Sequence, residues 1–252
     1  APVREPEPLG FWGGPRWFVA GRIDLGFLYL RPQFHFGWGT PHETYLTVEV
    51  DPLIAGNGVG IYGGLRGALE HADLRVGARY LFAFTRSFLA PDPMGGGYDD
   101  LQLRDRSGPS SRYLSLEAQL SFDIPIGPVA IESEITGTYV TLVDPGFDVF
   151  EETLRVVVRP PFVWSASLGL EIRLGDHEEF WITPLAEVVH LVGREEVVVR
   201  VGLRAGIQLW PDLSVRLIAM AAVLSPDSLG ASGSDSFLLG LRVHHPIVEK
   251  EK

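Results

Sequence analysis

The 252-residue chain contains no cysteine, and its only lysines are Lys250 and Lys252. Without cysteine the protein has neither a disulfide framework nor thiol chemistry. No stretch approaches 18 uninterrupted apolar residues, so the sequence predicts no transmembrane helix. The net charge is −11, which disfavours a nucleic-acid partner because nucleic-acid phosphates bind basic surfaces.

The stretch 195–225 shows the pattern that recurs along the chain. One face of its first half is wholly apolar: Val197, Val199, Val201, Leu203, Ala205, Ile207 and Leu209. The other face carries Arg200, Gly202, Arg204, Gly206 and Gln208. Alternation with a period of two is typical of a β-strand. Soluble strands average about five or six residues, whereas roughly 9–11 tilted residues cross a bilayer. The stretch therefore predicts a transmembrane β-hairpin.

The same alternation predicts ten membrane strands. The first begins near Arg16, and the others lie near 57–70, 74–85, 114–124, 129–139, 162–173, 180–192, 195–209, 213–223 and 237–244. The alternation continues past Arg31-Pro32 and is too long for the membrane alone, and the next segment is similarly long with a break at Asp51-Pro52. Residues 32–56 are therefore interpreted as the far end of a hairpin that projects beyond the bilayer. Pro184 predicts a bulge or a phase slip in its strand, since proline has no N–H for the ladder. Residues 1–15 are expected to be an extended lead, 16–246 a single barrel, and 247–252 a charged C-terminal tail.

Connection lengths favour a membrane barrel. Short turns near 71, 126, 176 and 211 alternate with long segments at 32–56, 86–110, 144–161 and 225–235, and only the connection near 193 breaks the series. Outer-membrane barrels have short periplasmic turns and longer external loops. An all-β, antiparallel up-and-down barrel of ten strands would place both termini in the periplasm. Twelve strands is the alternative, if residues 43–51 and 149–158 are also barrel strands.

The chain resembles the bacterial outer-membrane β-barrel superfamily over residues 16–246. The resemblance rests on the repeated amphipathic strands, the loop asymmetry and aromatic residues near strand ends: Trp17, Tyr29, Tyr139, Trp164 and Trp210. It implies a location in the outer membrane with the lipid bilayer as a partner. The chain departs from the pattern at its end, where HHPIVEKEK replaces the common terminal aromatic residue. A soluble sandwich or lipocalin-like barrel is disfavoured by the long strands and by their charged, glycine-rich minority face.

Charged residues fall on the face opposite the apolar one, and they are expected to line the lumen. The set is Arg22, Asp24, Arg66, Glu70, Arg75, Arg79, Glu117, Asp123, Glu132, Glu134, Glu171, Arg173, Glu187, Arg200, Arg204, Arg216 and Arg242. Acids dominate the fourth to seventh expected strands and arginines dominate the others, which predicts an acidic wall opposite a basic wall. Because buried charges must be paired or hydrated, these walls either meet in ion pairs that fill the lumen or flank water.

Two functions follow from this interior. The first is a narrow channel for ions or small solutes. The alternative is a non-conducting scaffold or anchor of a cell-envelope complex, which binds envelope proteins through projections at 32–56, 86–110 and 144–161. An eight-stranded barrel is just filled by its side chains, whereas open channels have 16–18 strands, so a ten-stranded barrel is expected to be plugged or very narrow.

Residues that carry chemistry are sparse, and no enzyme, cofactor or metal is expected. Asp176-His177 falls in a predicted periplasmic turn, and Asp99-Asp100 falls in an external loop. His190 is expected to be interfacial or structural. His244 and His245 point to opposite faces of a strand, so the pair does not easily bind one metal.

Overall fold

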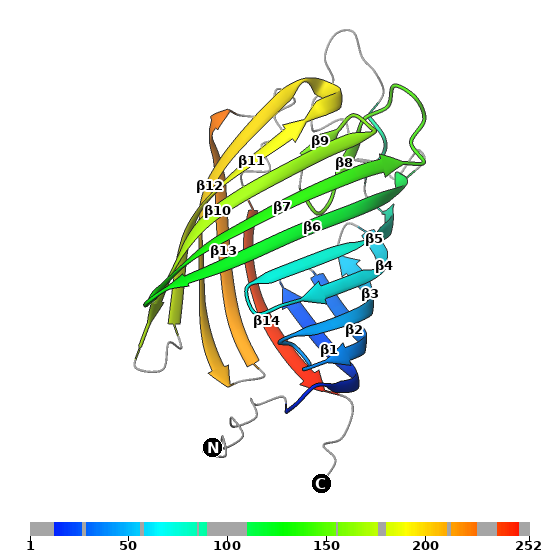
Figure 1. Cartoon of the computed structure of the whole chain (residues 1–252). Coiled ribbons are helices and arrows are strands. Elements are labelled where there is room, and N and C mark those ends of the chain that lie inside the picture. The colour runs from blue at the N-terminus through cyan, green and yellow to red at the C-terminus, as the bar shows by residue number, and fades with distance from the viewer. Residues whose placement is uncertain are drawn as a thin grey trace, which may run out of the picture.

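The fold is all-β in the computed structural model. The model describes residues 13–26, 29–55, 58–84, 86–89, 110–154, 156–175, 180–210, 213–225 and 236–246. Within these residues twelve strands form one closed antiparallel barrel, in which each strand pairs with the next along the sheet and the last pairs with the first (Figure 1). The strands are β1 (Arg16–Gly26), β2 (Tyr29–Gly39), β3 (Tyr45–Ala55), β4 (Gly58–Ala68), β5 (Ala72–Ala83), β6 (Arg112–Ile126), β7 (Val129–Thr141), β10 (Phe162–Leu174), β11 (Phe180–Leu191), β12 (Glu196–Trp210), β13 (Leu213–Ser225) and β14 (Ser236–Pro246). The expected antiparallel up-and-down sheet is confirmed.

The preferred count of ten strands is corrected to twelve, because residues 32–56 do not form a projecting hairpin. They supply most of β2 and β3, which pair with β1 and β4 along their whole lengths. Pro32 and Pro52 interrupt only the β2–β3 ladder, which lapses between Leu30–Ile54 and Phe34–Val50 and resumes in the same register. A proline removes one donor on one side of its strand, so the pairing on the other side survives.

The alternative count of twelve is confirmed in number and in one of its two additional strands, because residues 45–51 belong to the wall strand β3. Residues 149–158 lie outside the barrel wall and form a separate two-stranded sheet of β8 (Val149–Glu151) and β9 (Val156–Val158). The additional wall strands are β2 and β3. A short 3-10 helix, η2 (Val192–Arg194), connects β11 to β12.

The two ends of the barrel differ. At the turn end, the connections span 40–44, 69–71, 127–128, 175–179 and 211–212. At the loop end they span 27–28, 56–57, 84–111, 142–161, 192–195 and 226–235. The first strand begins and the last strand finishes at the turn end, as an even number of strands requires (Figure 1).

Alternation sorts the side chains between the two faces of the wall. Outward positions expose large apolar side chains such as Phe36, Trp38, Ile61, Leu65 and Leu168. Inward positions include buried polar and charged groups on almost every strand whose side chains are described. A soluble barrel would bury the apolar face instead. Of the helices among the described residues, none has the length and apolar character needed to cross a bilayer.

Candidate functional site in the barrel lumen

Part of the connection 142–161 folds back into the loop end of the lumen. Its two strands, β8 and β9, consist of buried residues that are at most 7% exposed. They pack into a cluster with apolar residues from β5, β6, β7, β10, β11 and β12: Leu81, Tyr113, Val140, Val163, Val189, Leu191 and Val198. Because these wall residues are buried and point inward, the hairpin that packs with them lies inside the barrel. Figure 1 shows β8 and β9 at the loop end. We call this hairpin the lumen hairpin.

Polar contacts fix the lumen hairpin to the wall at several points. Arg200 on β12 donates from Nη2 to the carbonyl oxygen of Leu154 over 2.8 Å. Arg194 donates to the carbonyl oxygen of Val157 over 2.9 Å. The backbone N–H of Glu152 donates to the Tyr113 hydroxyl over 3.1 Å, and its carboxylate pairs with Arg86. The hairpin is therefore docked by directional bonds as well as by apolar burial.

Glu151 in the lumen hairpin is fully buried. Its carboxylate accepts a hydrogen bond from the backbone N–H of Leu154 over 2.6 Å. Burial, and then the negative charge of Glu117, raise the pKa of Glu151 to about 7. The Leu154 bond and Arg79 act in the opposite direction. This acid therefore changes protonation near neutral pH.

A second layer of the lumen consists of arginine–carboxylate pairs. Arg75 on β5 binds both Glu49 and Asp51 on β3. Its guanidinium also lies 3.7 Å from the centroid of the Tyr62 ring. Arg79 donates two hydrogen bonds, of 2.6 and 2.8 Å, to the carboxylate of Glu117 on β6. Each of these guanidinium and carboxylate groups is largely buried, so the pairs cross-link nearby strands on the lumen side of the wall.

The remaining predicted lumen residues occupy several different environments. Four further pairs form: Arg66–Asp73 at 2.8 Å, Arg173–Glu171 at 2.7 Å, Arg200–Glu187 at 3.5 Å, and Arg204–Glu132. Asp123 lies 3.4 Å from His71 Nδ1, and Glu134 accepts a bond of 2.6 Å from Gln119. Asp24 is buried, Arg22 lines a cavity at the turn end, and Glu70 is exposed in a turn. The side chains of Arg216 and Arg242 lie outside the described part of the chain.

Five lumen residues escaped the sequence reasoning: Arg31, Gln33, His35, Glu49 and Asp51. All lie on β2 and β3, most of which was assigned to a projecting hairpin because the alternating segments were too long for one membrane crossing each. The alternation of Gln33 and His35 with Phe34 and Phe36 was the signal that could have found them. Two of these residues are acids beside Arg75, so the expected division into an acidic and a basic wall is replaced by local pairs.

The turn-end half of the lumen contains polar cavities. One of about 550 Å³ is bordered by acids and arginines from several strands: Arg66, Asp73, Asp123, Glu132, Glu134, Glu171, Arg173, Glu187 and Arg204. We call it the lumen cavity. A neighbouring cavity, also of about 550 Å³, is lined by Arg22, His42, Glu43, Tyr45 and Arg66 among others. Burial, Arg22 and Arg66 lower the pKa of His42 to about 4, which keeps its ring neutral at physiological pH.

Only some of the residues considered for catalysis or metal binding have described side chains. His190 accepts a bond of 3.1 Å from Trp164 Nε1 on the outer face of the wall, which is a structural role. Among the described residues, no group of three or more histidine, aspartate and glutamate side chains could hold a metal ion. Asp99-Asp100 and Asp176-His177 lie outside the described residues, and the side chains of His244 and His245 are not described either.

Comparison with known proteins adds only similarities to solved structures. No protein-family model and no curated protein matches the sequence. An outer membrane channel from Pseudomonas putida F1 has a TM-score of 0.46 at 11% identity, covering 96% of this chain and 100% of that chain. The CymD monoaromatic hydrocarbon channel has a TM-score of 0.41 at 10% identity, with coverages of 94% and 90%. The NanC porin has a TM-score of 0.40 at 9% identity, with coverages of 93% and 100%. All three TM-scores are below 0.5, so these similarities carry no inference about substrate or mechanism.

Proposed function

We propose that the protein is a bacterial outer-membrane barrel that forms a narrow channel for ions and small polar solutes, and that the lumen hairpin closes the channel in this conformation. Its outward face is apolar while its inward face is polar, the arrangement that a bilayer requires of a barrel. The short turns would face the periplasm. The polar cavity of about 550 Å³ inside the turn-end half supports a channel rather than a solid plug.

The charge around the lumen cavity favours cations. Its lining contains six carboxylates and three guanidinium groups. The carboxylates are Asp73, Asp123, Glu132, Glu134, Glu171 and Glu187; the guanidinium groups are Arg66, Arg173 and Arg204. A cavity with this excess of negative charge raises the local concentration of cations, because low-dielectric walls focus the field. We therefore expect the open channel to select cations over anions.

Single-channel recording in planar bilayers tests the proposal. The comparison is between the full chain and a variant in which residues 149–158 are replaced by a glycine–serine linker. The linker variant should give stable open steps, with a reversal potential in a KCl gradient that indicates cation preference. The full chain should open more rarely. A linker variant that is folded, as judged by heat-modified gel mobility, and still silent would overturn the channel.

The second candidate function is a non-conducting scaffold or anchor, and one observation favours it. The cluster around the lumen hairpin is almost wholly buried, and its polar contacts join the hairpin to β6 and β12 as well as to Arg194 and Arg86, as a permanent plug would require. Silence of both the full chain and the linker variant supports this role. Of the three projections first considered as partner-binding segments, 32–56 is part of the wall, 144–161 is largely the lumen hairpin, and 90–109 lies outside the described residues.

A further inference from the structure

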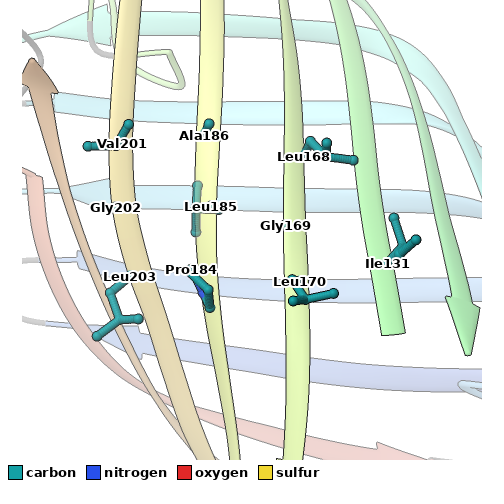
Figure 2. Close-up of a pocket in the computed structure, with 10 residues that line it drawn as sticks. All are labelled: Ile131, Leu168, Gly169, Leu170, Pro184, Leu185, Ala186, Val201, Gly202 and Leu203. Atoms are coloured by element: carbon teal, nitrogen blue, oxygen red, sulfur yellow. The ribbon is translucent and has the colours of Figure 1, made fainter. Parts of the chain in front are cut away.

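The outer face of the barrel carries an apolar trough over β10, β11 and β12. Its volume is about 840 Å³, within the range of small-molecule sites. On β11 the outward side chains are the small Pro184 and Ala186. Larger aliphatic side chains border them on both sides: Leu168 and Leu170 on β10, and Val201 and Leu203 on β12 (Figure 2). A groove of this form, with aliphatic sides and no charged lining residue, suits a linear alkyl chain.

The wall beneath the trough is weakly bonded. Pairing of β10 with β11 lapses between Gly169–Leu185 and Ile172–Ile182, without a change of register. Pairing of β11 with β12 continues through Pro184, which lies opposite Leu203. A Cβ added to Gly169 would lie 3.5 Å from the Pro184 carbonyl oxygen, so the backbone of Pro184 faces β10. The donor that proline lacks is therefore missing from the β10–β11 seam.

The lumen cavity lies directly behind this seam. Gly169 and Leu185 border both the trough outside and the lumen cavity inside, so at this point the wall is one backbone layer thick. Thr183 adjoins them and is fully buried. Its Oγ1 has no hydrogen-bond partner among the described residues. A buried hydroxyl without a partner is unfavourable, so the wall holds an unsatisfied polar group beside the seam.

The other proline-interrupted seam, between β2 and β3, is sealed differently. Behind Pro32 and Pro52 the lumen side is covered by Asp51 and by the two arginines that pair with it, Arg31 and Arg75. Proline alone therefore does not make an opening. The β10–β11 seam differs because an apolar trough and a polar cavity meet at it.

We propose that the β10–β11 seam at Pro184 is a lateral port for a cationic amphiphile, whose alkyl chain lies in the trough and whose compact head lies in the acid-rich lumen cavity. The trough selects the aliphatic chain, and the excess of carboxylates inside selects the positive head. The port shares its cavity with the proposed channel, and to that extent it rests on the proposed function. It does not need passage beyond the lumen hairpin, so conductance and lateral binding can fail independently.

Photolabelling of the full chain in phosphatidylcholine nanodiscs tests the port. The probe is dodecylammonium with a terminal diazirine, and dodecyl sulfate with the same diazirine is the matched probe of opposite charge. Labelled peptides are quantified by mass spectrometry at the trough and at the outward β6–β7 face around Leu116 and Tyr139. The expected result is an excess of labelling at the trough over the β6–β7 face for the ammonium probe alone.

Three variants separate the port from ordinary lipid contact. Pro184→Val restores the missing donor and should reseal the seam, and Ala186→Phe fills the trough; each should remove the excess. Ala118→Phe is the control, because Ala118 is an exposed outward alanine on β6, and it should leave the excess unchanged. Heat-modified gel mobility verifies folding of each variant. Equal labelling of the two faces by both probes would overturn the port, as would an excess that survives both Pro184→Val and Ala186→Phe.

Discussion

Glu151 is expected to make closure of the lumen depend on pH. Its carboxyl is buried only while the lumen hairpin is docked, and its pKa in that state is about 7 instead of the ordinary 4.5. A group whose pKa is raised in the docked state binds more protons there than in the undocked state. It contributes its full stabilisation below the undocked pKa, and that contribution is lost as pH rises through the docked pKa. Docking should therefore weaken between pH 4.5 and about 7.

The size of the effect follows from the two pKa values. Their difference corresponds to about 3 kcal/mol of docking free energy, at about 1.4 kcal/mol for each pKa unit. Between about pH 5 and about pH 8 the undocked population should rise by up to roughly two orders of magnitude. Glu151→Gln mimics the protonated acid and keeps an oxygen for the Leu154 N–H. This variant should stay docked at every pH.

Two measurements check this expectation. Open probability in planar bilayers should increase with pH for the parent chain and stay low for Glu151→Gln. Hydrogen exchange of the 149–158 peptide, corrected for the intrinsic pH dependence of exchange, should follow the same trend without relying on conduction. Glu195→Gln is the control, because Glu195 is exposed at the same end of the barrel. The reasoning fails if Glu151→Gln retains the pH dependence of the parent chain, or if the hairpin of the parent chain becomes more protected as pH rises.

Three substitutions examine other parts of the structure. Val50→Arg places a charge on the outward face of β3 and should lower stability in lipid vesicles by about 2–4 kcal/mol if the site is near the midplane. Urea titration of this variant and of the control Val50→Leu would show no such difference if β3 projected beyond the bilayer. Arg200→Met removes a hydrogen bond from a charged donor to the hairpin, which contributes about 1.5–3 kcal/mol, and it should raise open probability at constant pH. An unchanged open probability would mean that apolar packing alone holds the hairpin. Arg75→Met leaves two buried carboxylates without their partner and should lower the free energy of unfolding by about 3–5 kcal/mol in the same urea titration. The partly exposed ion pair of Arg173 provides the comparison, since Arg173→Met should lower it by about 1 kcal/mol or less.

The sequence by itself determined which face of most wall strands points out of the barrel and which points into the lumen. That assignment needs only the period-two geometry of an extended chain. Every second residue from Val197 to Leu209 could therefore be assigned to the outer face, and Arg200 and Arg204 to the inner face, without knowledge of their neighbours. The asymmetry between short turns and long connections was visible for the same reason, because it depends on order along the chain.

Tertiary structure decided the strand count, the partners of the charges and the position of the lumen hairpin. Pro32 and Pro52 indicate a break when they are considered alone. Only the pairing shows that their missing donors face each other and leave the ladders to β1 and β4 intact. Which acid meets Arg75 depends on the stagger of β3 against β5, which no local pattern encodes. The lumen hairpin finds its position because six wall strands present apolar residues inward at the loop end, and that surface exists only after the barrel has closed.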